Sequence, residues 1–180
     1  MEIKQINRLW YVLHTKSRFE TVVNDALVKK SFEVFLPKIL VKSRRRDRRL
    51  MIRIPLFPGY LFLKTGLQSP EHIEILKTGG AVRLIGNKEG PIPVAAETIE
   101  SLKIMVAGDN KVLTGACFKK GDPVTVVYGP FTGLTGIFVQ YRGKGRVIVT
   151  IEALRQFAAV DVSKEDVERL PKIGHNRLTS

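Results

Sequence analysis

The pattern of hydrophobic residues changes near residue 108, and this change constrains the fold more than any other feature. Before it, β-like stretches alternate with amphipathic helical patterns, whereas after it only short β-branched runs and glycine-bearing turns remain. Two patterns in a chain of 180 residues indicate two folding units. The predicted parts are a first domain over 1–107, a linker over 108–117, a second domain over 118–172 and a frayed tail over 173–180.

The first unit has the pattern of a mostly antiparallel sheet with helices packed on it. Residues 8–15 are apolar on both faces, as in a central strand, and Ser17 with Glu20 has the S-x-x-E spacing of a helix capping box. One strand is predicted over 32–41. Further strands are predicted at 50–57, 59–64 and 81–86, and further helices at 69–77 and 94–108. This order is typical of a ferredoxin-like α/β sandwich, so the chain as a whole is of the α+β class.

The second unit is predicted to be a small five-stranded SH3-like β-barrel. Its β-branched runs are separated by turns that contain glycine. The predicted strands cover 122–128, 134–141, 146–152 and 156–162. The segment 163–170 is predicted as either a last helical turn or a short strand.

Positive charge dominates the chain and is concentrated near its start. Lys and Arg number 30 against 17 Asp and Glu, a formal charge of +13, and residues 1–53 hold 14 of these cations against five acids. Such an excess favours a polyanionic partner, nucleic acid first, although a basic surface also serves only to keep a protein in solution. The candidate phosphate-binding residues are Lys42, Arg44, Arg45, Arg46, Arg48 and Arg49. Two alternatives for this segment are a solvated loop and a loop that pairs with an acidic protein surface.

Cysteine and histidine content argues against disulfides and metal sites. The single cysteine, Cys117, excludes an internal disulfide and fits a reducing, cytoplasmic setting. The three histidines are scattered and have no metal-ligand spacing: His14, His72 and His175. The chain also has no signal-peptide core and no apolar run of about 18 residues, so neither export nor a membrane span is expected.

Catalysis is not indicated either. Three acidic residues of the first unit form no two-carboxylate metal site by their spacing: Glu20, Asp25 and Glu33. No nucleophile lies beside a base that would activate it. We therefore predict a binding protein, not an enzyme, with no cofactor and no metal.

Three glycines and one phenylalanine mark a tight connection in the second unit. Gly129, Gly133 and Gly136 suit positive φ angles or close backbone approach, and Phe131 between them is placed to anchor the loop. The glycines alone indicate an ordinary β-turn. The whole pattern over 124–139, V-x-x-x-x-G-P-F-x-G-x-x-G-x-F/V, resembles the KOW motif of ribosomal and transcription proteins.

The stretch LFPGYLFL at 56–63 carries a second resemblance. Together with the WYVLHT strand, the helix after it and the KOW segment, it resembles the NusG family of transcription elongation factors over about residues 8–170. That resemblance implies that the first domain docks on the clamp helices of RNA polymerase through an apolar pocket. The implied pocket residues are Tyr11, Phe57, Tyr60 and Phe62. Aromatic anchors suit such a contact, but the period of two in a strand means that about half of these side chains would face the core.

The resemblance also implies partners beyond the polymerase clamp. It places the basic loop beside upstream DNA or the non-template strand, and it gives the barrel a small-subunit ribosomal protein or the termination factor Rho as partner. Ile151 and Leu154 are the candidates for that face, and both fit the barrel core equally well. The basic loop is similar to that of specialised RfaH-like or long-operon antiterminators. The β-branched strands predict a barrel without an autoinhibitory helical state.

The function that follows is a monomeric, non-enzymatic elongation or antitermination factor. It would bind RNA polymerase, suppress pausing or termination and recruit a second partner through the KOW unit. The alternative is an RNA-binding, ribosome-associated KOW protein, which would leave the features of residues 10–63 unexplained.

Overall fold

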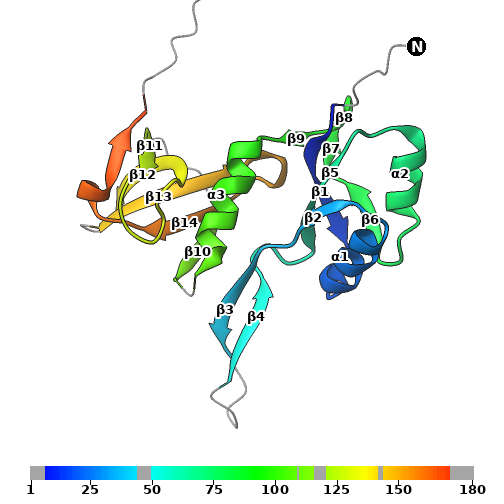
Figure 1. The fold of residues 1–180 in the computed structure, drawn as a ribbon, viewed down its shortest axis with the longest axis horizontal. Helices are drawn as coiled ribbons and strands as arrows, with labels where there is room; N and C mark the ends of the chain where they lie inside the picture. Colours follow the sequence, from blue (N-terminus) through cyan, green and yellow to red (C-terminus); the bar gives the residue numbers. More distant parts are fainter. Residues whose placement is uncertain (1–6, 44–49, 109, 116–120, 142–143, 171–180) are drawn as a thin grey trace, which may run out of the picture.

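The computed structural model describes residues 7–43, 50–108, 110–115, 121–141 and 144–170. They form two antiparallel sheets, two short hairpins and three helices (Figure 1). The elements of the first part are β1 (Leu9–Thr15), α1 (Glu20–Lys29), β2 (Glu33–Phe35), β3 (Lys38–Lys42), β4 (Met51–Pro55), β5 (Tyr60–Thr65), α2 (Ser69–Leu76), β6 (Ala81–Leu84), β7 (Gly86–Asn87), β8 (Gly90–Pro91), β9 (Pro93–Val94) and α3 (Ala96–Ala107). Those after them are β10 (Val112–Gly115), β11 (Asp122–Val126), β12 (Thr135–Tyr141), β13 (Lys144–Ile151), η1 (Glu152–Leu154), β14 (Gln156–Asp161), η2 (Lys164–Asp166) and β15 (Val167–Arg169).

The first sheet has the order β2-β5-β1-β6, with β9 also paired to β1. The central strand β1 is apolar on both sides because helices cover both faces, as its sequence predicts. Tyr11 and Leu13 pack with residues of α1 and α2. Trp10 and Val12 face the other way, into a cluster that includes three residues of α3. The ferredoxin-like arrangement itself stays a prediction.

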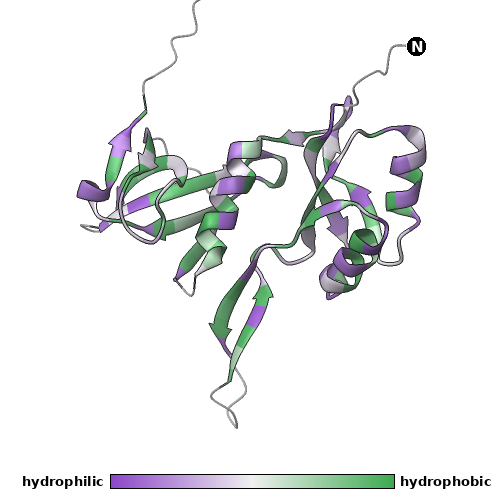
Figure 2. Ribbon diagram, viewed as in Figure 1, coloured by the Kyte–Doolittle hydropathy of each residue, from purple (hydrophilic) through white to green (hydrophobic). Residues whose placement is uncertain are grey.

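The expected strand over 32–41 is in fact two strands in different sheets. It is interrupted at Pro37, which has no N–H to donate to a ladder and whose carbonyl instead accepts the N–H of Leu56 at 2.8 Å. Beyond Pro37 the chain leaves the first sheet and forms β3, which pairs only with β4. The resulting β3–β4 hairpin projects from the body (Figure 1), and Figure 2 shows hydrophobic residues along both of its strands.

The capping box predicted for the first helix does not form. Helix α1 begins at Glu20 with Phe19 as its N-cap residue, and no side chain caps it. Arg18 has a φ of +66°, so the backbone turns sharply between Ser17 and the helix. Glu20 is therefore the first helical residue rather than the third. Its carboxylate instead accepts a hydrogen bond from the backbone N–H of Gly59.

The second sheet has six strands rather than the predicted five, in the order β10-β14-β13-β12-β11-β15. The additional strand is β10, which lies inside the expected linker. It pairs with β14 in a register that places Val112 opposite Val160. The segment 163–170 forms both of the structures considered for it, a short 3-10 turn and then β15. The β-branched runs form strands, as predicted.

A single apolar cluster connects the two sheets through α3. It contains Trp10 and Phe62 of the first sheet, Leu102 of α3, and Leu134 and Val149 of the second part. One polar contact reinforces the packing: the buried Ser101 hydroxyl donates to the Thr135 carbonyl at 3.0 Å and accepts the Thr135 N–H at 3.1 Å. The expected linker is thus flanked by two parts that share one core.

Candidate functional site

The turn between β4 and β5 is held from two sides. Gly59 adopts a φ of +83°, a conformation that favours glycine, and its carbonyl accepts the N–H of Thr15 at 2.8 Å. Its own N–H donates to the buried Glu20 carboxylate at 2.7 Å. The end of β1 and the start of α1 therefore fix the position of Tyr60, which directly follows the turn.

The four aromatic residues predicted to line a docking pocket do not share one exposed surface. Phe57, Phe62 and Tyr11 are 1%, 0% and 7% exposed. Phe57 and Phe62 meet edge to face at 6.2 Å in the cluster on the α3 side, against which Tyr60 also packs. Tyr11 lies on the opposite face of the sheet, where burial raises the pKa of its phenol. Tyr60 alone is partly accessible.

Two residues of β1 on the same face as Tyr60 and Phe62 were not among the predicted site residues. His14 is paired with Tyr60 across β1 and β5, and the two rings stack at 5.2 Å. Trp10 is 5% exposed and has the ammonium groups of Lys64 and Lys103 at 5.9 and 5.5 Å from its ring centroid. The alternation of side chains along β1 could have identified both, because even-numbered positions there share the face of Val12 and Phe62.

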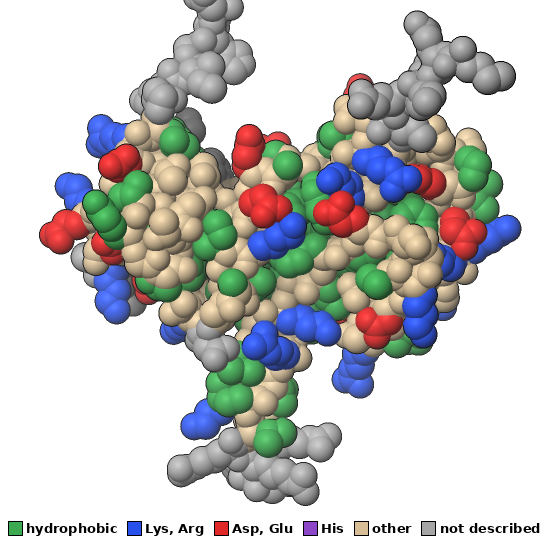
Figure 3. Space-filling model, viewed as in Figure 1, with side chains coloured by type: hydrophobic (Ala, Val, Ile, Leu, Met, Phe, Trp, Pro, Cys, Tyr) green, Lys and Arg blue, Asp and Glu red, His purple; other side chains and the backbone are tan. Residues whose placement is uncertain are grey.

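The predicted nucleic-acid-binding residues lie at and beyond the end of the β3–β4 hairpin. Lys42 is the last, exposed residue of β3, and the other five, between 44 and 49, lie outside the described residues. The hairpin is closed by a 2.8 Å hydrogen bond from the Ser43 N–H to the Leu50 carbonyl. Figure 3 shows hydrophobic side chains on this projection and Lys or Arg side chains near its base. Leu50 and Met51 are 58% and 52% exposed, which is unusual for large aliphatic side chains in a group.

The KOW-like segment forms a compact loop between β11 and β12. Gly129 and Gly133 have φ angles of +87° and +88°, and Phe131 between them is buried in the shared core. Gly136 has a different role, because a Cβ there would lie 2.5 Å from the Ile148 carbonyl oxygen. The glycines thus serve the two purposes that the sequence indicates, positive φ and close approach.

The two predicted partner-binding residues of the second part face inward. Ile151 is 1% exposed and Leu154 is half-buried in η1. Both pack in or against the cluster shared with α3. In this arrangement Ile151 offers no surface to a partner.

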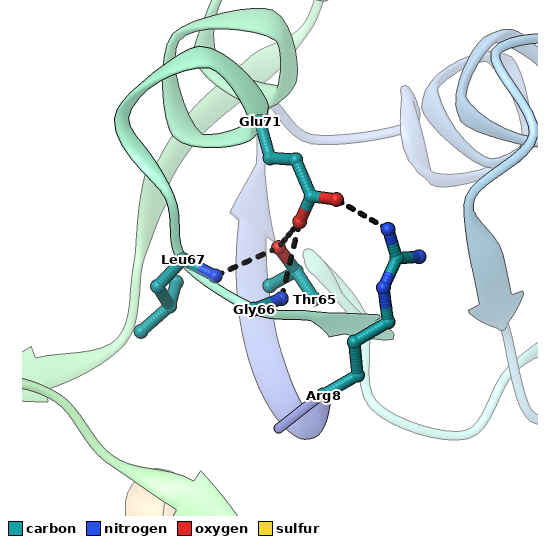
Figure 4. A network of polar contacts seen from close by, with 5 residues as sticks. All are labelled: Arg8, Thr65, Gly66, Leu67 and Glu71. Atoms are coloured by element: carbon teal, nitrogen blue, oxygen red, sulfur yellow. Dashed lines mark hydrogen bonds and ion pairs between the residues drawn. The ribbon is translucent and has the colours of Figure 1, made fainter. Parts of the chain in front are cut away.

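A polar network ties the ends of β1, β5 and α2 together (Figure 4). Glu71 accepts hydrogen bonds from the Thr65 hydroxyl at 2.6 Å and the Gly66 N–H at 3.1 Å, and it pairs with the Arg8 guanidinium. The Thr65 bond contributes most to holding the pKa of Glu71 below its ordinary value of 4.5; burial acts in the opposite direction. The network thus connects α2 to the paired ends of the two central strands of the first sheet.

Comparison with known proteins identifies the family. Residues 8–103 match the family model described as "Transcription termination factor nusG". The chain is 30% identical over 164 residues to the "Transcription termination/antitermination protein NusG" of Thermus thermophilus, a match that covers 79% of this chain and 89% of that protein. The chain belongs to the NusG family. The same-named protein of Treponema pallidum is 27% identical with the same coverage.

A solved structure supports the fold of this NusG-family chain. "Domain interaction in Thermotoga maritima NusG" covers 92% of the chain and is itself covered to 99%, with a TM-score of 0.52 and 21% identity. The family match includes β1 to most of α3, and the curated relatives extend over most of the remainder. The relatives are transcription termination/antitermination proteins, so the chain is a NusG-family transcription termination/antitermination factor.

Two further observations concern other kinds of site. Within the described ranges, no three His, Cys, Asp or Glu side chains come together as metal ligands. The helices described by the structure are all too short or too polar to cross a membrane.

Proposed function

We propose that this NusG-family factor binds RNA polymerase through its first part, about residues 1–107, at the clamp helices. It suppresses pausing or termination by binding and not by catalysis, and it acts as a monomer. The observation that carries the proposal is the Tyr60–His14 ring pair, which lies at the surface on a turn fixed by Thr15 and Glu20. A rigid, partly accessible tyrosine is a typical anchor of a protein interface.

The basic segment that starts at the last residue of β3 is proposed to contact DNA or RNA of the elongation complex. The exposed Lys42 starts this segment, and five arginines follow it in the sequence. Cations on a projecting hairpin give a salt-dependent attraction to phosphates without sequence specificity. This contribution should weaken as salt rises, whereas contact through Tyr60 should persist.

The second part, proposed to be an SH3-like KOW barrel over about 118–172, would recruit a small-subunit ribosomal protein or Rho. Leu154 and Ile151 are the proposed contact residues. Because Ile151 is buried against the α3 side, use of this face requires the second sheet to separate from α3. The first part is proposed to be a ferredoxin-like sandwich.

The polymerase proposal is tested by measuring the affinity of core RNA polymerase for the full chain at low and high salt. Tyr60→Ala should weaken binding about tenfold at both salt concentrations, because an interface anchor is lost. Lys42→Ala is the matched control, and it should weaken polymerase binding only at low salt. Phe57→Ala is unsuitable, since emptying a fully buried site destabilises the fold by about 3–5 kcal/mol. Undetectable binding of the wild-type chain, or binding indifferent to Tyr60→Ala in a folded variant, would contradict the proposal.

A further inference from the structure

The strand register sorts the side chains of the β3–β4 hairpin onto two different faces. Directly paired residues of antiparallel strands point to the same side. The pairs Ile39–Ile54 and Val41–Ile52 therefore form one face, here called the aliphatic face. The pairs Lys38–Pro55, Leu40–Arg53 and Lys42–Met51 form the other, here called the basic face.

The aliphatic face remains accessible in the structure. Ile52 and Ile54 are 37% and 36% exposed, and Val41 is half-buried. An isolated two-stranded hairpin is only marginally stable in water. A row of β-branched aliphatic side chains exposed on it is energetically unfavourable unless another surface covers them. The face thus has the character of an interaction surface.

The aliphatic face starts close to the turn before Tyr60 in the sequence, because Ile54 belongs to β4 and Tyr60 is the first residue of β5. Ile39, at the base of the hairpin, packs against the same core cluster as Phe35 and Tyr60. The aliphatic face therefore begins at the base of the hairpin, where β4 leads into the turn before Tyr60, and it extends outward along the projection seen in Figures 1 and 3.

The buried aromatics make the hairpin more important for docking. Phe57 and Phe62 are at most 1% exposed, so they offer almost no area to a partner. On the hairpin that leads to this turn, Ile52 and Ile54 of the aliphatic face do keep accessible apolar area. Apolar area at the centre of a contact is what drives protein association.

The separation of the two faces indicates which kind of molecule covers the aliphatic one. Nucleic acid is bound mainly through cations on its phosphates, and the hairpin's cations, Lys38, Lys42 and Arg53, lie on the basic face. The aliphatic face carries none, which suits an apolar protein surface. We propose that the aliphatic face docks on an apolar surface of RNA polymerase next to the Tyr60 contact, with the basic face turned away from that contact. This inference rests on the proposed function.

The test compares two cross-strand pairs that are neighbours on the hairpin. Val41→Ser/Ile52→Ser changes the aliphatic face, and Leu40→Ser/Arg53→Ser is the matched change on the basic face. The affinity of each full-length variant for core RNA polymerase is measured at high salt, where exposed charges contribute little. The first variant should bind at least about tenfold more weakly than wild type, and the second within about threefold.

Folding is checked by circular dichroism and urea unfolding of each variant. If Val41→Ser/Ile52→Ser does not fold, Val41→Thr/Ile52→Thr keeps the β-branched shape of the face while making it polar, and its affinity should also fall. Equal losses of affinity in both paired variants, or no loss in the aliphatic-face variant, would overturn this inference. The proposal that the wild-type chain binds RNA polymerase would still stand. Loss of affinity for duplex DNA instead of polymerase would also overturn the inference, in favour of nucleic acid. A wild-type chain that does not bind polymerase would overturn both proposals.

Discussion

The Glu20 carboxylate accepts a 2.7 Å hydrogen bond from the backbone N–H of Gly59, 39 positions along the chain. The bond links the first residue of α1 to the turn that precedes Tyr60. Glu20 is 6% exposed, so its carboxylate is largely removed from water and depends on this partner. The orientation of the proposed docking turn is thus set by a helix outside the β4–β5 connection.

Replacing Glu20 should loosen this turn. Glu20→Ala leaves the Gly59 N–H without its acceptor and should lower the free energy of unfolding by about 1–3 kcal/mol, measured by urea denaturation. Glu20→Gln keeps an acceptor oxygen and should lower the free energy of unfolding by less than Glu20→Ala does. Glu97→Ala, an exposed residue in the first turn of α3, is the control and should change stability by less than about 0.5 kcal/mol. Equal effects of Glu20→Ala and Glu97→Ala would show that the bond does not contribute.

Glu71 should make stability depend on acidic pH. Because its folded-state pKa lies below the ordinary value of 4.5, the network stabilises the fold above that pH, and this contribution is lost as pH falls through the lowered pKa. Thr65→Val removes the hydroxyl that contributes most, so the pKa of Glu71 should rise. Unfolding measured between pH 7 and pH 3 should then show a smaller loss of stability on acidification than in wild type. An unchanged pH dependence in Thr65→Val would contradict this account.

The KOW-like glycines should differ in their tolerance of alanine. At Gly129 a Cβ meets nothing within 4 Å, so Gly129→Ala should cost only the backbone strain of its positive φ, about 1–2 kcal/mol. At Gly136 a Cβ would lie 2.5 Å from a backbone oxygen, which cannot move aside alone. Gly136→Ala should therefore cost about 3 kcal/mol or more. Thermal unfolding of both variants checks the order, and a milder effect at Gly136 would refute it.

The Ser101–Thr135 contact should stabilise the packing of the second sheet on α3. Ser101→Ala removes the donor for the Thr135 carbonyl and the acceptor for its N–H, and it should destabilise the protein by about 1–3 kcal/mol. Ser163→Ala, at an exposed position, serves as control. If the two variants unfold at the same urea concentration, the pair is not a stabilising contact.

Local pattern was enough to place elements whose periodicity is strong. The helix expected over 94–108 is α3, Ala96–Ala107, because its apolar stripe has the helical period. The glycines of the KOW-like loop were likewise identifiable from their spacing. The NusG-family resemblance is confirmed by the family match.

Features that depend on distant parts of the chain could not be predicted in the same way. Ser17 and Glu20 have capping-box spacing, but the Gly59 N–H takes the carboxylate. The expected strand over 32–41 divides at Pro37, because the two halves find different pairing partners. The burial of Phe57 and Phe62 likewise depends on α3, a helix that comes much later in the sequence.

The sharing of α3 by both sheets has a consequence for limited proteolysis. Lys119 and Lys120 provide trypsin with cleavage sites between β10 and β11. A cut there would break the peptide chain but leave β10 paired with β14 and α3 packed against β12 and β13. The two fragments would therefore elute together on gel filtration and part only in denaturant, because side-chain packing and strand pairing hold the halves together independently of the backbone that joins them.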